Sequence, residues 1–394
     1  MEATMKKMSV TLETITPLFL SGNDQRAVEL RAASIRGHLR YWYRALLGGA
    51  FVAYYSQPER LAQEIHKRES EIFGTTDRGS RVLIRVRERP PHRETGFSFS
   101  GKFIRYLGYG LEKRKAFAPG QKFDLEISLW RSATEFESVI AATLWAALSL
   151  GNLGARSRRG FGSLTFANEG ILAPLTVREP ASFEELADQL RTNLKSVVSV
   201  FEKHAGHKYA TPSDLPPFSV VCPEYWKLLV VRTAYDSWEK ALDAIGEKLR
   251  VFREDRTKGQ HSRTTPKGKT SSYYVTRDYD AVRGFFDARG PAIPRGSIFG
   301  LPHQFQFSST DDKVMIKGEG CIDRRASPLH IRVFRAGEAY YLGLQVFKSR
   351  FLPGDLEFED LNRNSHKAIV KAPDYKALDD FIATFTDVEE INPW

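Results

Sequence analysis

The sequence GARSRRGFG, residues 154–162, decides how the first half of this chain is interpreted. It contains three glycines and three arginines and no acidic residue. An apolar segment with helical periodicity, 135–150, precedes it, and a short strand-like segment, 162–166, follows it. P-loops and dinucleotide fingerprints lie directly before a helix, so this loop belongs to neither class.

The composition of this glycine-rich loop indicates contact with an anion. Glycines let the backbone adopt positive φ and bring its N–H groups close to a ligand. Arginine guanidinium groups pair with phosphate oxygens in a planar, forked geometry. We therefore expect the loop to hold phosphate through Gly154, Gly160, Gly162, Arg156, Arg158 and Arg159. The alternative interpretation is a solvated loop whose arginines contact acids elsewhere in the protein.

The patterns on either side of the loop predict a ferredoxin-like domain. The expected elements are, in order, a strand at 8–20, helices at 34–49 and 58–73, strands at 81–89 and 122–130, a helix at 135–150 and a strand at 162–166. Ser34 is expected to cap the first helix, and Gly48-Gly49 to end it. With the second helix as an insertion, this order is the split βαβ arrangement. The predicted fold class is α+β.

The remainder of the chain, 172–394, is expected to form a second, larger α+β domain after a first domain at 1–171. Its expected elements are helices at 182–204, 237–253 and 375–385, strands at 218–222 and 226–234, and a hairpin at 330–347. Residues 256–272 contain five basic residues and no acid, and they lack apolar periodicity. They are interpreted as a mobile basic loop. The strand order of this domain is not predicted.

Length and composition indicate a folded protein with a polyanionic partner. The chain has 394 residues, 42% hydrophobic and 12% aromatic content, and a formal net charge of +10. Nucleic acid is the first candidate partner and an anionic membrane surface the second. No apolar run is long enough to span a bilayer and no secretion signal is recognised, so the cytoplasm is the expected compartment. Cys222 and Cys321 could form a single disulfide, but without a secretion signal they are expected to be buried thiols.

Three further basic surfaces favour nucleic acid. Arg36, Arg40 and Arg44 share one face of the first helix, and like charges at this spacing repel, so an anion is expected beside them. The strand at 81–89 has a basic face, and the loop at 256–272 is the third surface. Four aromatic residues that could stack on bases lie among or beside the basic residues: Tyr41, Tyr43, Tyr106 and Phe161.

Catalytic and metal-binding signatures are weak. His204 and His207 have an HxxH spacing, but no neighbouring ligand set completes a metal site, so neither a metal nor another cofactor is expected. Asp311 and Asp312 are interpreted as turn residues. His38 is the one candidate general base, because the charges of the neighbouring Arg36 and Arg40 favour its neutral form. The simpler interpretation is a surface or RNA-contacting histidine.

Five motifs in order along the chain resemble a known family. They are ITPLFLSGND at 15–24, LRAASIRGHLRYWYRALLGG at 30–49, GARSRRGFGSL at 154–164, IFGLPHQF at 298–305 and CIDRRASPLHIRVF at 321–334. The first three resemble RAMP-superfamily proteins of CRISPR systems, which carry a glycine-rich loop after the second core helix. With the last two, the chain resembles the first-numbered RAMP subunits of type III-B (Cmr) effector complexes.

This resemblance implies two tandem ferredoxin-like (RRM-like) RAMP domains and a non-catalytic, RNA-binding role. In that family the subunit caps an RNA-guided complex near the crRNA 3′ region and meets crRNA, target single-stranded RNA and other RAMP subunits. The expected RNA-binding residues are Arg31, Arg36, Arg40 and Arg44 in a groove, Arg156, Arg158 and Arg159 in the loop, and Arg324 and Arg325 in the second domain. Contacts should reach mainly phosphate and ribose.

Two other functions stay open at this point. The first is a metal-independent CRISPR endoribonuclease with His38 as general base. The second is a module whose basic faces dock acidic protein surfaces and not RNA.

Overall fold

The structure is a computed structural model that describes residues 5–99, 101–167, 170–172, 175–264, 270–307, 310–320, 322–363 and 366–394. Cys321 and residues 265–269 of the basic loop lie outside the described residues. The contacts divide the chain into two compact units. The first unit consists of Met1–Ile245, His330–Ser349 and Asp387–Trp394, and the second of Gly246–Leu329 and Arg350–Thr386. The first unit contains residues on both sides of 171–172, because 172–245 and 330–349 belong to it as well.

The first unit contains a four-stranded antiparallel sheet with the order β2-β5-β1-β6. Its strands are β1 (Lys6–Thr14), β2 (Val82–Glu88), β5 (Lys122–Leu129) and β6 (Leu164–Phe166). The helices between them are α1 (Ala32–Phe51), α2 (Pro58–Phe73) and α4 (Glu137–Ser149). This element order agrees with the pattern around the glycine-rich loop.

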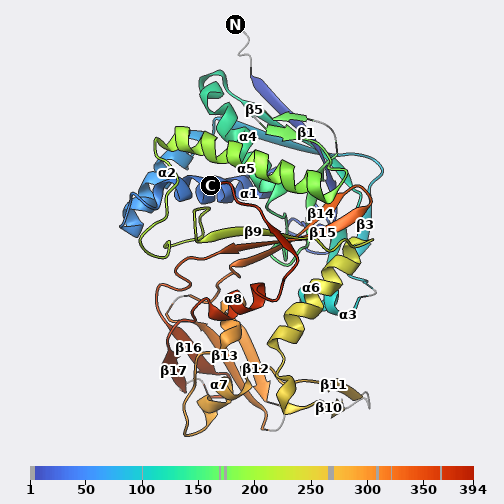
Figure 1. Cartoon of the computed structure of the whole chain (residues 1–394), viewed down its shortest axis with the longest axis vertical. Helices are drawn as coiled ribbons and strands as arrows, with labels where there is room; N and C mark the ends of the chain where they lie inside the picture. Colours follow the sequence, from blue (N-terminus) through green and yellow to red (C-terminus); the bar gives the residue numbers. More distant parts are fainter. Residues whose placement is uncertain are drawn as a thin grey trace. The chain divides into compact units, whose positions relative to one another are not determined.

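Strand alternation decides which side of this sheet is buried. Val10 of β1 lies opposite Leu125 of β5, and both belong to the hydrophobic core. Helix α1 packs against α2, α4 and the long helix α5 (Phe183–Ala205), as Figure 1 shows. Helix α4 is buried almost all round, which explains why its sequence has little polar periodicity. Short elements lie between β2 and β5: β3 (Glu94–Gly96), α3 (Lys102–Leu107) and β4 (Lys115–Phe117). The short helix η1 (Arg131–Phe136) follows β5.

A second four-stranded sheet of the first unit has the order β14-β15-β9-β18. Its strands are β9 (Trp226–Val231), β14 (Leu329–Ala336), β15 (Ala339–Phe347) and β18 (Val388–Glu390). Counted along the chain, both sheets have the spatial order second, third, first, fourth strand. A two-stranded ribbon, β7 (Gly170–Leu172) and β8 (Leu175–Val177), precedes α5.

The second unit has its own sheet, β12-β13-β16-β17. The strands are β12 (His303–Phe307), β13 (Asp312–Gly318), β16 (Leu356–Asp360) and β17 (Lys367–Val370). The remaining elements are α6 (Trp238–Arg253), which begins in the first unit, η2 (Arg256–Lys258), β10 (His261–Thr264), β11 (Thr270–Tyr273), α7 (Tyr279–Arg283), η3 (Gly284–Phe286), η4 (Arg295–Phe299) and α8 (Lys376–Ile382).

Helix α1 differs from its prediction at both ends. It begins at Ala32, after Arg31, whose side chain makes no capping hydrogen bond, so Ser34 is not the cap. It also continues through Gly48 and Gly49, which the sequence pattern interprets as a stop. A Cβ on Gly49 would lie 1.8 Å from the backbone oxygen of Val221, so these glycines let another segment cross the helix.

That crossing segment explains a wrong strand prediction at 218–222. The Val221 N–H donates to the Ala45 backbone oxygen at 2.9 Å, and Val220 and Val221 are fully buried. The segment is therefore apolar because it packs on α1, and it is not part of a sheet. Cys222 at its end is a free, buried thiol, as predicted, and burial raises its pKa to about 12.

The basic loop at 256–272 is more regular than its composition indicates. Its described part contains β10 and β11, which pair with His261 opposite Tyr273 and Thr264 opposite Thr270. No described helix is long and apolar enough to cross a bilayer.

Candidate nucleic-acid interface

A cavity of about 370 Å³ lies between α1 and the glycine-rich loop, within the first unit. It is lined by Leu20, Ser34, Gly37, His38, Tyr41, Trp42, residues 150–154, Ser157, Arg158 and His330. Ser34, Gly37, His38 and Tyr41 follow each other at the spacing of one helix face. The structure thus brings together His38, Gly154 and Arg158, which the sequence singled out separately.

The glycines of the loop adopt the backbone conformation that was predicted. Gly154, Gly160 and Gly162 have φ values of 86°, 88° and 73°. A Cβ on Gly162 would lie 1.9 Å from the Leu153 backbone oxygen, and one on Gly154 would lie 2.6 Å from that of Phe19. These close approaches are to the protein's own chain, so the glycines shape the loop as one wall of the cavity.

Strand β14 holds the loop in place from far along the sequence. Ile331 pairs with Arg159 in an isolated bridge, and its N–H donates to the Arg158 backbone oxygen at 3.1 Å. The Asn152 side-chain amide donates to the backbone oxygens of Ile331 and Ser157 at 2.8 and 2.6 Å. The loop is therefore held against β14 through backbone groups and the Asn152 amide, and these bonds do not use the arginine side chains of the loop.

A buried arginine, Arg332, joins the two ends of the loop. Its guanidinium donates to the backbone oxygens of Gly151 and Leu164. Burial lowers its pKa to about 9. Gln345 of β15 adds a bond from its amide to the Leu150 oxygen at 2.5 Å. These bonds fix both ends of the loop relative to the second sheet.

His38 is neutral, but not for the predicted reason. Its Nε2 lies 2.7 Å from the Ala147 backbone oxygen, which can only accept, so Nε2 carries the proton. Burial, with the charge of Arg332, lowers its pKa to about 4. From the sequence, we expected the charges of Arg36 and Arg40 to favour the neutral form of the His38 imidazole. Arg36 and Arg40 instead donate to the Val82 backbone oxygen and to Glu69.

His330 lines the same cavity, and sequence reasoning did not find it. Its side chain is 8% exposed, and among the described residues its Nε2 has no hydrogen-bond partner. Burial, together with the charge of Arg158, holds its pKa well below the usual value. The signal that could have revealed it is the pair His330 and Arg332, which place two polar side chains on one face of a strand whose only other polar residue is Arg335.

The three loop arginines have different surroundings. The Arg158 guanidinium carbon lies 6.0 Å from the centre of the Tyr41 ring, at the cavity. Arg156 is exposed, has a positive φ of 57°, and donates to the Tyr109 backbone oxygen. The Arg159 N–H donates to the Arg156 oxygen at 2.8 Å, which closes the turn between them. Arg158 is therefore the loop arginine that belongs to the cavity.

The arginines of α1 lie outside the cavity lining. Arg40 and Arg44 donate to one carboxylate oxygen of Glu69 in α2, at 2.7 and 2.8 Å. The Glu69 side chain is 2% exposed. Its carboxylate is therefore a buried anion beside these arginines, as expected from the repulsion between like charges on one helix face. Arg36 donates to the Val82 backbone oxygen at 3.2 Å, and Arg31 lies 3.5 Å from a carboxylate oxygen of Glu29.

Arg324 and Arg325 belong to the second unit. Arg324 is exposed, whereas the Arg325 guanidinium carbon lies 5.7 Å from the centre of the Phe351 ring. Leu301 and Arg325 exchange backbone hydrogen bonds at 2.7 and 3.2 Å. The IFGLPHQF and CIDRRASPLHIRVF motifs therefore meet in space at this point.

The other candidate sites have structural explanations. His204 lies 2.8 Å from the Tyr43 hydroxyl among aromatic rings, and among the described residues no group of three or more His, Cys, Asp or Glu could hold a metal ion. Asp311 has a φ of 55° in a turn, and Asp312 pairs with Arg283 at 2.6 Å.

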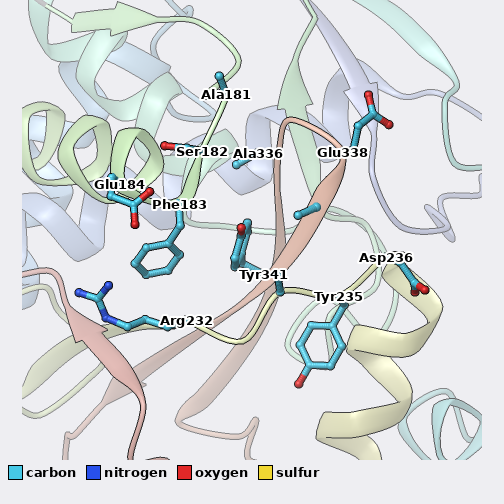
Figure 2. A pocket seen from close by; sticks show the side chains of 12 residues that line it. Ala181, Ser182, Phe183, Glu184, Arg232, Tyr235, Asp236, Ala336, Glu338 and Tyr341 are labelled. Atoms are coloured by element: carbon cyan, nitrogen blue, oxygen red, sulfur yellow. The ribbon is translucent and has the colours of Figure 1, made fainter.

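A larger, more open cavity of about 720 Å³ lies where α5 begins (Figure 2). Phe183 packs against Tyr341, and Arg232 lies over the Phe183 ring at 4.9 Å. Three acids also line this cavity: Glu184, Asp236 and Glu338. Such acids repel phosphate, so the smaller cavity beside Arg158 is the better candidate for RNA.

The chain matches the family model of the RAMP superfamily over residues 11–165. It is 34% identical to the CRISPR system Cmr subunit Cmr1-2 of Pyrococcus furiosus over 180 residues, which cover 39% of this chain and 91% of that relative. It is 29% identical to Cmr1-1 of the same organism over 222 residues, 54% of this chain and 62% of the relative.

Two solved structures have the same overall fold as this chain. The crystal structure of apo Cmr1 from Pyrococcus furiosus has a TM-score of 0.62 and 21% identity, covering 99% of this chain and 100% of that one. A chain of type III-B Cmr-beta bound to cognate target RNA has a TM-score of 0.52 and 15% identity, covering 97% and 99%. With the sequence relatives, these likenesses show that the chain belongs to the RAMP superfamily, in the family of Cmr1 subunits of CRISPR systems.

Proposed function

We propose that this chain is a non-catalytic, RNA-binding subunit of a type III-B CRISPR complex that targets RNA in the cytoplasm. In such a complex it caps the assembly near the crRNA 3′ region, beside other RAMP subunits, and contacts both crRNA and target RNA. The observation that carries this proposal is the cavity in which Arg158, Tyr41 and the glycine-rich loop come together. A cation beside an aromatic ring suits the phosphate and the base of a single strand.

The arginines divide into three groups in this proposal. Arg158, with Arg31, Arg156 and Arg159 around it, binds phosphates next to the cavity. Arg36, Arg40 and Arg44 add positive charge along α1, and Arg40 and Arg44 contribute less because both already pair with the buried carboxylate of Glu69. Arg324 and Arg325 form a separate contact in the second unit.

We also propose that the chain consists of two tandem ferredoxin-like domains with insertions. The shared strand order of the two four-stranded sheets supports this, since each reads second, third, first, fourth along the chain. In the second domain the insertion has two parts, one between α6 and β14 and one between β15 and β18, and together they form the sheet β12-β13-β16-β17.

The nuclease alternative is the weaker one. A general base works best with a pKa near the working pH, whereas the pKa of His38 is about 4. Its Nε2 proton is also engaged by the Ala147 oxygen at 2.7 Å. A neutral histidine of this kind suits contact with RNA better than proton abstraction from a ribose.

Binding of labelled single-stranded RNA to the full chain in EDTA, over a salt series, tests the proposal. The affinity should fall with salt and vary little between unrelated sequences, and the RNA should stay intact. Arg158→Ala should lower the salt slope by about 0.7 for a lost phosphate contact. Glu338→Gln, in the acidic cavity, should leave the slope unchanged. Cleavage that His38→Ala abolishes, or binding only to an acidic protein, would contradict the proposal.

A further inference from the structure

The open cavity where α5 begins (Figure 2) is a groove with aromatic and acidic lining. Its volume of about 720 Å³ lies within the range of binding sites, roughly 300–1,000 Å³. Its walls come from three segments of the first unit, within 181–184, 232–236 and 336–341. Phe183 and Tyr341 are part of the lining, with their ring centres 5.2 Å apart. The groove therefore offers an apolar base beneath charged side chains.

Hydrogen bonds hold the walls of this groove in place. The Gly337 N–H donates to the Pro180 oxygen at 2.8 Å, which joins the turn between β14 and β15 to the segment before α5. Tyr235 and Tyr340 exchange backbone hydrogen bonds at 2.9 and 2.8 Å, which joins the loop after β9 to β15. The groove is therefore preformed, and a partner binds it without the entropic cost of ordering its walls.

The groove carries negative charge that the chain itself does not neutralise. Among the described residues, neither Glu184 nor Glu338 pairs with a cation, and both are exposed. The third acid, Asp236, already has a lysine partner. Arg232 is the one cation among the described lining residues, and it pairs with Glu389 at 2.5 Å. Two carboxylates therefore remain for a partner, in a chain whose net charge is +10.

The placement of these two acids indicates an extended occupant. In Figure 2, Glu184 lies beside Phe183, and Glu338 lies on the other side of the Tyr341 ring. A protein segment along the groove can present one basic side chain to each acid. The methylene groups of lysine and arginine pack on apolar surface while their charged ends reach carboxylates. Arg232 already shows such a contact, with its guanidinium carbon 4.9 Å from the centre of the Phe183 ring.

We propose that this groove docks an extended basic segment of a neighbouring protein subunit, with one cationic side chain at Glu184 and another at Glu338. The inference rests on the proposed function, in which the chain lies beside other RAMP subunits, and it names the surface and the chemistry of that contact. The acids that repel RNA from the groove attract such a segment. The groove thus keeps the protein contact separate from the RNA contact.

Charge reversal on the full chain tests the groove. The double variant Glu184→Lys, Glu338→Lys is added to the remaining subunits of the complex, assembled on a guide RNA, and its affinity is measured over a salt series. Like charges across an interface repel and leave the cations of the partner unpaired, so the affinity at low salt should fall at least about tenfold. The difference from the wild-type chain should shrink as salt rises, because exposed charges are screened.

The matched control is Glu59→Lys. Glu59 is the second residue of α2, as Glu184 is of α5, and both are exposed, so the two substitutions disturb their helix ends alike. The Glu59→Lys chain should join the complex as tightly as the wild-type chain. Thermal unfolding of both variants shows whether the fold is kept.

A photo-crosslinker in place of Tyr235, a half-buried residue of the lining, identifies the occupant without relying on charge reversal. In the assembled complex, benzoylphenylalanine at this position should form an adduct with a protein segment that contains lysine or arginine. An adduct with RNA, or no adduct, would overturn the proposal whatever the double variant does.

The outcomes distinguish this inference from the proposed function. A double variant that joins the complex as tightly as the wild-type chain would overturn the docking groove and leave RNA binding and membership of the complex intact. A wild-type chain that joins no complex would overturn the proposed function and this inference with it.

Discussion

At the scale of single residues, Glu69 decides how the arginines of α1 are held. Its buried carboxylate accepts from Arg40 and Arg44, which are 30% and 44% exposed. Glu69→Gln should lower the free energy of unfolding by about 1–2 kcal/mol, less than a fully buried pair because both arginines reach solvent. Thermal unfolding measures this.

The matched control for this change is Glu64→Gln on the same helix. Glu64 is half-buried and is not the acid that Arg40 and Arg44 share. Glu64→Gln should change the free energy of unfolding of the chain by less than about 0.5 kcal/mol, as most surface substitutions do. Equal effects of the two substitutions would mean that Glu69 does not hold the pair.

A second prediction at this scale concerns pH and His38. Its pKa is about 4 in the folded chain and 6.5 when unperturbed. Between these values the unfolded chain binds a proton that the folded chain does not bind, so stability falls as the pH falls through this window. The loss amounts to about 3 kcal/mol once both states are protonated.

Denaturant unfolding between pH 7 and pH 4 tests the assignment. His38→Gln should reduce the pH dependence without abolishing it, because burial also lowers the pKa of His204 to about 4 and holds that of His330 well below its usual value. His66→Gln, at an exposed position, should keep the wild-type profile. An unchanged profile in His38→Gln would show that the imidazole is solvated in the folded chain.

At the scale of elements, two glycines of α1 should respond to alanine in opposite ways. A Cβ on Gly37 would meet no atom within 4 Å, so Gly37→Ala should stabilise the chain by up to about 1 kcal/mol through helix propensity. A Cβ on Gly49 would lie 1.8 Å from the Val221 oxygen, so Gly49→Ala must displace the crossing segment and should destabilise. Melting temperatures of the two variants give the comparison directly, and a shift of the same sign in both would contradict this packing.

The same helix shows what a sequence can and cannot predict. Local signals were sufficient for α2, whose predicted and observed limits agree, and for Ser182, whose side chain caps α5. They failed at Gly48-Gly49, because a pair of glycines in the sequence is compatible both with the end of a helix and with a helix that another segment crosses at close distance. That distinction depends on Val221, which lies far away in the sequence.

The candidate site follows the same rule. The glycine-rich loop and Arg158 could be predicted because φ preference and charge are properties of the residues themselves. His330 and Arg332 could not be placed there, because the pairing of β14 with the loop is a long-range contact. Their alternation with the apolar residues of β14 was the available sign, and it indicated burial but not the partner.

At the scale of the whole molecule, the glycine-rich loop depends on residues well outside 1–171. Arg332 and Gln345 donate to the backbone oxygens of Gly151 and Leu150, and Ile331 pairs with Arg159. Without these partners the backbone oxygens of Gly151 and Leu150 would lose their hydrogen-bond donors. Each buried polar group left without a partner costs about 1–3 kcal/mol. A fragment of residues 1–171 should therefore lack a formed loop.

Expression of residues 1–171 alone, compared with the full chain, tests this dependence. The fragment should show no cooperative thermal transition and should bind single-stranded RNA at least tenfold more weakly, because the wall that carries Arg158 is not held. Co-expression with residues 172–394 should restore both properties, since it returns β14 and the segment that crosses α1. A fragment that melts cooperatively and binds RNA as tightly as the full chain would instead show that the predicted first domain is complete by itself, and that the contacts with β14 stabilise the loop without forming it.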